Sequence, residues 1–169
     1  DAIYLCLGVA LGFLAILRLR SVREYSRKPA PTSREEAKEW ETVYITYGAM
    51  HGFLLGLFCF ITIYWSPDLF GEMAAVCVTL ASATSIAGRN YGSPRMVMIF
   101  IMTMTWPISL GFLMRGDVFH VILGCLSIPF FFAIRNFAST VRDVLFTALG
   151  AEKTANRLAQ RFDRALNTM

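Results

Sequence analysis

Five long apolar runs, separated by short polar connections, dominate the hydropathy pattern of the chain. Glu72 is the only charged residue inside any of these runs. A helix rises about 1.5 Å per residue, so about 20 residues cross the roughly 30 Å apolar core of a membrane, where backbone groups must be paired within the segment. The pattern therefore predicts an all-α fold, a polytopic transmembrane helical bundle with spans at residues 2–17, 43–65, 69–87, 96–114 and 118–134.

The composition changes this picture only in detail. Hydrophobic residues make up 56% of the 169 residues and charged residues 17%, against about 25% charged in an average soluble domain. Of the 16 Lys and Arg residues, 15 lie in the segments 18–41, 88–95 and 135–169. The positive-inside rule places these segments and the C-terminus in the cytoplasm, which also explains the net charge of +4 without nucleic acid as a partner.

The ends of the chain suggest that it belongs to a longer protein. The first apolar run starts directly after Asp1, and the sequence stops at Met169 inside a helical pattern. We expect one preceding helix, which would make six spans and return both termini to the cytoplasm.

The cytoplasmic connection 18–42 carries signals for the end of one helix and the start of another. Pro29 and Pro31 are expected to break the incoming helix, because proline lacks a backbone donor. Ser33 and Glu36 have the spacing of a capping box, so a new helix is predicted to begin there, before the membrane is reached.

Small residues at four-residue spacing predict close packing of the second span. Gly48, Gly52 and Gly56 share one helix face, and small residues on the third span make that helix the expected partner. A dimer contact or a ligand groove on the same face is the alternative.

The candidate ligand-binding residues are few. His51 lies about 12 Å from the inner end of its span and His120 close to the outer end of another, so one haem cannot be held by both. Glu72, Cys77, His120 and Cys125 share the outer half and would suit a soft metal ion or a small ligand. We assign no metal site and no cofactor, because no zinc-type spacing or catalytic motif occurs. Solvated or snorkelling side chains are the alternative.

The residues after the last span, 135–169, predict a cytoplasmic signalling helix that follows a sensor bundle at 1–134. A heptad repeat makes every seam position apolar over four heptads, which predicts a coiled coil and hence a homodimer. The alternative is one amphipathic helix lying on the membrane surface. The seam comprises Val141, Val144, Ala148, Ala151, Ala155, Leu158, Phe162, Ala165 and Met169.

Three short motifs resemble a known family. Glu39-Trp40-Glu41-x-x-Tyr44, Arg115-Gly116-Asp117 and the stretch 160–169 are similar to the six-helix (MASE-like) membrane sensor regions of bacterial GGDEF/EAL proteins that carry PAS domains. The resemblance implies a bacterial inner-membrane input module that signals to a cytoplasmic output domain in cis. That output would be a cyclic di-GMP diguanylate cyclase or phosphodiesterase. Alternatives are the sensor module of a histidine kinase, a small transporter and a structural membrane subunit.

Overall fold

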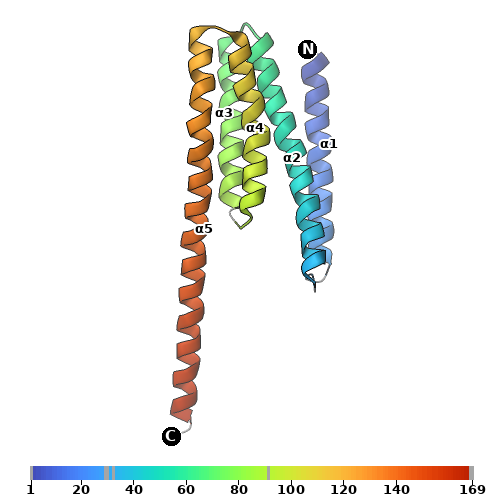
Figure 1. Ribbon diagram of the computed structural model, residues 1–169. Coiled ribbons are helices and arrows are strands. Elements are labelled where there is room, and N and C mark those ends of the chain that lie inside the picture. The colour runs from blue at the N-terminus through green and yellow to red at the C-terminus, as the bar shows by residue number, and fades with distance from the viewer. Residues whose placement is uncertain (1, 29–30, 32, 91, 168–169) are drawn as a thin grey trace.

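The computed structural model describes residues 2–28, 31, 33–90 and 92–167, with side chains as far as Gln160 (Figure 1). In this part of the chain all regular structure is helical, and each of the five helices is long and apolar enough to cross a membrane. The all-α prediction is therefore confirmed. The helices are α1 (Ala2–Arg27), α2 (Arg34–Trp65), α3 (Leu69–Arg89), α4 (Pro94–Arg115) and α5 (Val118–Asn167).

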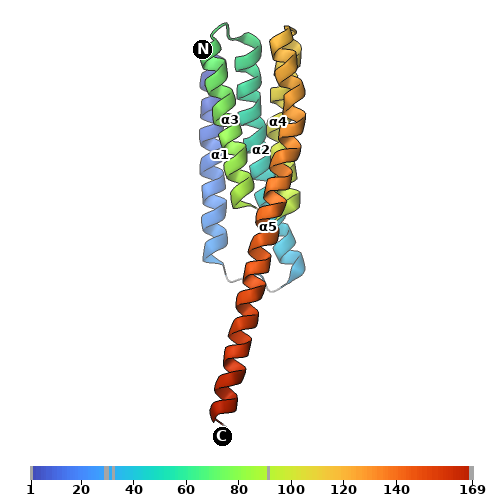
Figure 2. The ribbon, with the colours of Figure 1, turned by 90° about the vertical axis from the view of Figure 1, so that its left-hand side faces the viewer.

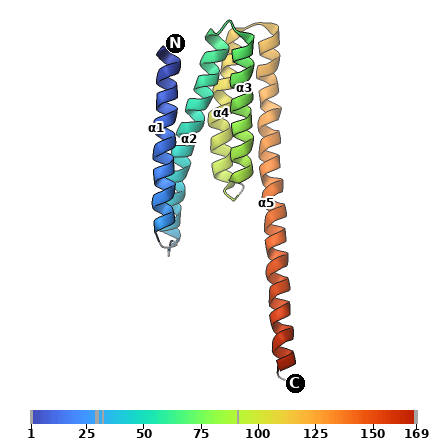
Figure 3. The ribbon, with the colours of Figure 1, turned by 180° about the vertical axis from the view of Figure 1, so that it is seen from behind.

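Successive helices run up and down (Figures 1 and 3). The α2–α3 and α4–α5 connections lie at one end of the bundle, and the α1–α2 and α3–α4 connections lie toward the other. α5 continues far beyond the bundle, as Figure 2 shows from the side. It crosses residues 134 and 135 without a break in the helix, so the last predicted span and the signalling helix are one element.

Side-chain caps lie at the starts of α2, α3 and α4. The Ser33 hydroxyl accepts a hydrogen bond from the Glu36 N–H at 3.1 Å, which confirms the predicted start of α2. Asp68 caps α3 and Ser93 caps α4 in the same way. α1 ends at Arg27, and Pro29, which was expected to break it, lies outside the described residues.

Two hydrophobic clusters form the core, and α4 contributes to both. The first includes Phe100 and Met104 of α4 with residues of α2, α3 and α5. The second joins Ile108 and Phe112 of α4 to Cys59 of α2 and its neighbours. Neither cluster contains a residue of α1, so the other four helices form the centre of the bundle.

The glycine face of α2 packs against α4, so the prediction that α3 is its partner was wrong. A Cβ atom added at Gly56 would lie 2.8 Å from the backbone carbonyl oxygen of Met104, and one at Gly52 would lie 2.8 Å from the hydroxyl of Thr103. The groove left by the glycines accommodates large side chains such as Phe100, whereas α3 approaches the core through its own small residues. Among these are the buried Ala75, Ala83 and Ala87.

Arginine and aromatic contacts hold α1 to the bundle. Arg18 donates a hydrogen bond to the Tyr44 hydroxyl at 3.1 Å and lies over the rings of Tyr44 and Phe100. Tyr25 meets Trp40 edge to face at 5.3 Å between ring centroids. α1 is otherwise largely exposed, so its packing rests mainly on α2.

We predict that Gly56→Ala lowers the free energy of unfolding by about 1–3 kcal/mol, because the new methyl group meets the backbone of α4, which cannot move aside cheaply. Unfolding in detergent, followed by circular dichroism, measures the change. Gly12→Ala is the control, because a Cβ atom built there has no described atom of another helix within 4 Å. Equal stability of Gly56→Ala and the unmodified protein would contradict the close approach of α2 and α4.

Candidate functional site

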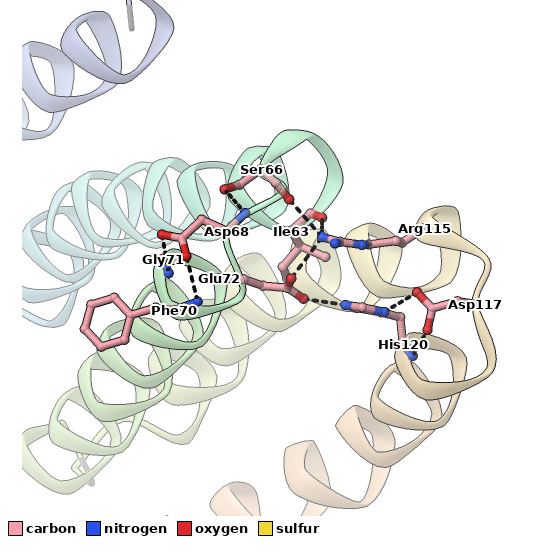
Figure 4. Close-up of polar contacts among 9 residues, drawn as sticks. All are labelled: Ile63, Ser66, Asp68, Phe70, Gly71, Glu72, Arg115, Asp117 and His120. Atoms are coloured by element: carbon pink, nitrogen blue, oxygen red, sulfur yellow. Dashed lines mark hydrogen bonds and ion pairs between the residues drawn. The ribbon is translucent and has the colours of Figure 1, made fainter.

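A cluster of four polar side chains connects the helix ends at the end of the bundle opposite the projecting part of α5 (Figures 1 and 4). Glu72 comes from the first turn of α3, Arg115 from the last residue of α4, Asp117 from the α4–α5 connection and His120 from the first turn of α5. This is the most concentrated group of interacting charges among the described residues.

Local sequence places each of these side chains. Asp68 accepts hydrogen bonds from the N–H groups of Phe70 and Gly71, and so fixes the first turn of α3 that carries Glu72. Gly116 has φ of 79°, a left-handed conformation that strongly favours glycine, and it reverses the chain directly after Arg115. Asp117 then caps α5 by accepting from the His120 N–H at 3.1 Å.

Arg115 links α2, α3 and α4 through a single guanidinium nitrogen. Its Nη1 donates to the backbone oxygens of Ile63 at 2.5 Å and Ser66 at 3.1 Å, and to Oε2 of Glu72 at 2.9 Å. The two carbonyl groups belong to the C-terminal end of α2, where helical partners are missing. The side chain of Arg115 therefore provides hydrogen bonds to free carbonyl groups at the end of α2 and also pairs with the carboxylate of Glu72.

His120 adds α5 to the same cluster. Its Nε2 lies 2.6 Å from Oε1 of Glu72, and its Nδ1 is hydrogen-bonded to Oδ2 of Asp117. A neutral imidazole has one N–H group, so both contacts are hydrogen bonds to ionised carboxylates only when the ring carries two protons. In that state the four side chains have no net charge.

The burial of Glu72 makes these contacts necessary. Its side chain is 3% exposed and that of His120 is 7% exposed, while Arg115 is 26% exposed. An isolated carboxylate in apolar surroundings is strongly disfavoured, and removal of one partner from a buried ion pair costs about 3–5 kcal/mol. Glu72 therefore holds the ends of α2, α4 and α5 around α3.

Asp117 is the exposed member of the cluster, and it lies outside the helices. Its side chain is 51% exposed. The hydrogen bond from the His120 backbone N–H lowers the pKa of Asp117 from its ordinary value of 3.8, and the His120 side chain contributes in the same direction. Asp117 therefore favours the capped, ionised form of the connection at neutral pH.

An apolar pocket of about 320 Å³ lies beside the cluster, between α3, α4 and α5. Glu72 and Cys77 lie on its wall, and the rest of its lining is almost entirely apolar, with Phe112, Phe119 and Phe130 among the residues. Both oxygens of Glu72 are already bonded, so the pocket suits an apolar molecule more than a charged one.

The structure brings together two of the predicted ligand residues and separates the others. Glu72 and His120 are in direct contact, and Cys77 is near them on the pocket wall but has an exposed side chain. Cys125 is exposed and does not line the pocket. His51 lies on α2, and its buried Nδ1 has no hydrogen-bond partner among the described residues. In the same part of the chain no group of three His, Cys, Asp or Glu residues is placed to hold a metal ion.

The predicted seam lies on the projecting part of α5. Val144 is 62% exposed and Leu158 is 49% exposed, so apolar side chains face outward there. The side chains of Phe162 and Ala165, and the whole of Met169, lie outside the described residues. The remaining seam positions are Val141, Ala148, Ala151 and Ala155, all on the same helix.

Sequence reasoning missed Arg115 and Asp117 as members of the site. Glu72 and His120 were named as candidate ligand residues, whereas Arg115 and Asp117 entered only through the Arg115-Gly116-Asp117 motif. The signal that points to them is the position of Glu72 at the start of one apolar run. In an up-and-down bundle this position lies at the same end as Arg115, which ends the next run, and His120, which starts the last one.

Comparison of the chain with protein-family models, with curated proteins and with solved structures finds no match.

We predict that Glu72→Gln lowers the free energy of unfolding by about 3 kcal/mol, because it removes the buried carboxylate that pairs with Arg115 and is hydrogen-bonded to His120. Chemical unfolding in detergent micelles measures the loss. Glu24→Gln is the matched control, since Glu24 pairs with Lys28 at 3.4 Å on an exposed helix face and such pairs contribute little. An equal effect of the two substitutions would show that burial of Glu72 is unimportant.

The lowered pKa of Asp117 predicts that the stability of the protein depends on pH in the acidic range. Its pKa is lower in the folded protein than in the unfolded one, so its contribution is complete above the ordinary value of 3.8 and is lost as the pH falls through the folded value. We expect the difference in stability between the unmodified protein and Asp117→Asn to shrink below pH 3.8. Asp143→Asn, an exposed carboxylate bonded to a neighbouring arginine, is the control. A difference that stays constant from pH 7 to pH 3 would contradict the assignment.

Proposed function

We propose that the chain is an integral-membrane input module that dimerises and passes a change in helix packing to a cytoplasmic output domain. The proposal places the five apolar helices in a bacterial inner membrane, with the C-terminus in the cytoplasm. It treats α5 as the element that carries the change out of the membrane.

The observation that carries this proposal is the continuity of α5. The helix starts at Val118, two residues before His120, and runs without interruption to Asn167. The proposal treats this continuous helix, which includes Pro129, as a rod that carries a displacement from one end to the other. The polar cluster holds the first turn of the rod, and the last turns project beyond the other helices (Figure 2).

The projecting part of α5 supports dimerisation because its apolar side chains have no partner in the described chain. Val144 and Leu158 occupy heptad seam positions and are exposed, while charged residues such as Lys153 lie off the seam. Exposed apolar residues at this spacing are typical of a helix that pairs with a second copy.

The nature of the output rests on the family resemblance. The motifs at 39–44, 115–117 and 160–169 resemble membrane sensor regions that precede PAS, GGDEF and EAL domains. The proposed output therefore makes or degrades cyclic di-GMP. Arg115 and Asp117 of the second motif are also the residues that join α4 and α5 to the polar cluster, which gives this motif a structural reason to be where it is.

A signal in such a module is a shift between two arrangements of the helices. A stimulus shifts the equilibrium only as far as it binds one arrangement more tightly than the other. The polar cluster and the apolar pocket beside it touch α3, α4 and α5, so binding there would act directly on the anchored end of the rod.

Disulfide crosslinking in native membranes tests the proposal. Cys6, Cys77 and Cys125 are replaced by serine, and the buried Cys59 is left in place. We expect Leu158→Cys to form a disulfide-linked dimer, because this position lies on the seam. Lys153→Cys, on the opposite side of the helix, is the matched control and should crosslink at least about fivefold more slowly, since the paired helices hold it apart.

The same assay tests transmission. Adding Glu72→Gln to the Leu158→Cys variant should change the rate of dimer formation, because the anchored end of α5 loses its buried partner. Absence of a crosslink at Leu158 would reject the paired helix. A normal crosslink whose rate is the same with and without Glu72→Gln would reject coupling between the cluster and the projecting segment.

A further inference from the structure

A groove of about 650 Å³ lies between the first turns of α4 and the middle of α5. Its lining residues belong to the start of α4 and to residues 135–142 of α5. Figures 1 and 2 show that α4 starts at the end of the bundle where the α3–α4 connection lies, near the level at which α5 leaves the other helices. The groove is far from the polar cluster of Glu72, which lies at the opposite helix ends. It is therefore a separate feature of the molecule.

Three arginines line the groove. They are Arg95 of α4 and Arg135 and Arg142 of α5, and none of the described residues that line it is acidic. In the part of the chain that the structure describes, Arg95 and Arg135 have no carboxylate partner. Arg142 contacts Asp143 at 3.2 Å, but that carboxylate is 68% exposed and lies outside the groove. Positive charges that line one groove, with no acidic residue among the described residues of its lining, favour an anion there.

Most of the remaining lining is apolar. Val97, Met98 and Met102 continue along α4 from the arginines toward the middle of the bundle. At about 1.5 Å per residue, Met102 lies about 10 Å from Arg95 along the helix axis. The groove therefore combines three arginines with apolar side chains that follow α4 from the helix end into the apolar core.

We propose that this groove binds one anionic phospholipid, with its phosphate-containing headgroup at Arg95, Arg135 and Arg142 and an acyl chain along Met98 and Met102. Guanidinium groups suit phosphate because they present several donors in a plane. A free phosphate ion would leave the apolar part of the groove empty, and a neutral lipid would leave the arginines without a counter-charge. The proposal needs the helices to lie in a membrane, but it does not depend on dimerisation or on signalling.

A lipid held there would connect two helices that carry different parts of the charge. Arg95 belongs to α4, whereas Arg135 and Arg142 belong to α5. A shared headgroup would therefore hold the start of α4 against α5 just before α5 leaves the bundle.

Native mass spectrometry of the purified chain in a neutral detergent tests the site. We expect phosphatidylglycerol to bind about tenfold more tightly than phosphatidylcholine, and inorganic phosphate at equal concentration not to displace it. Equal binding of the two lipids would overturn the proposal. Displacement of the lipid by inorganic phosphate would assign the arginines to a soluble phosphate ion instead and would also overturn it.

Paired variants locate the site. Arg95→Gln with Arg135→Gln should weaken phosphatidylglycerol binding about tenfold. Arg20→Gln with Arg23→Gln removes the same charge from α1 and should leave binding unchanged. Equal losses in the two double variants would show that only the overall charge matters, which contradicts a built site.

Two further variants keep the test independent of folding. Arg95→Lys with Arg135→Lys keeps the charge and should bind more tightly than the glutamine pair, with an unchanged circular dichroism spectrum. Met98→Trp leaves the arginines in place but fills the apolar part of the groove, and it should weaken phosphatidylglycerol binding. Unchanged binding by Met98→Trp would place the acyl chain elsewhere and reject the proposed groove.

Discussion

The cost of burying the carboxylate of Glu72 constrains the arrangement of the helix ends. Its side chain is almost fully enclosed, so it requires polar partners, and these are Arg115 of α4 and His120 of α5. Arg115 also takes up carbonyl groups at the end of α2, and His120 brings in Asp117. One buried charge thus determines how four helices meet, in a protein whose other helix contacts are mainly apolar.

The two ends of the bundle are consequently different in kind. At the Glu72 end, hydrogen bonds of defined direction fix α5 relative to α3 and α4. At the other end, α5 is held by apolar contacts of Ile134 and Ala138 and then continues alone. Apolar contacts are less directional than charged hydrogen bonds, so movement of α5 is easier at the end where it leaves the bundle.

The sequence predicted the class of fold well because long uncharged runs allow few alternatives. Residue types and spacing alone predicted that α2 begins after its cap, Ser33. They also showed that the spans carry almost no charge. The packing partner of each helix could not be predicted in this way. Gly48, Gly52 and Gly56 show that something approaches α2 closely, but spacing along one helix does not say which neighbour has the side chains that fit, and α4 has them. For a similar reason, the sequence identified only two of the four residues of the polar cluster. Glu72 and His120 stood out as polar residues in apolar runs, whereas Arg115 and Asp117 looked like ordinary connection residues until the helix ends were placed together.

The order of packing along the chain has a consequence for biosynthesis. The glycine face of α2 is covered by Phe100 and Met104, and Phe100 lies 44 positions after Gly56 in the sequence. At roughly 5–20 residues per second, a ribosome needs several seconds to make that distance. Until Phe100 has been made, the glycine face of α2 lacks the side chains that later pack against it, and neither hydrophobic cluster can be completed.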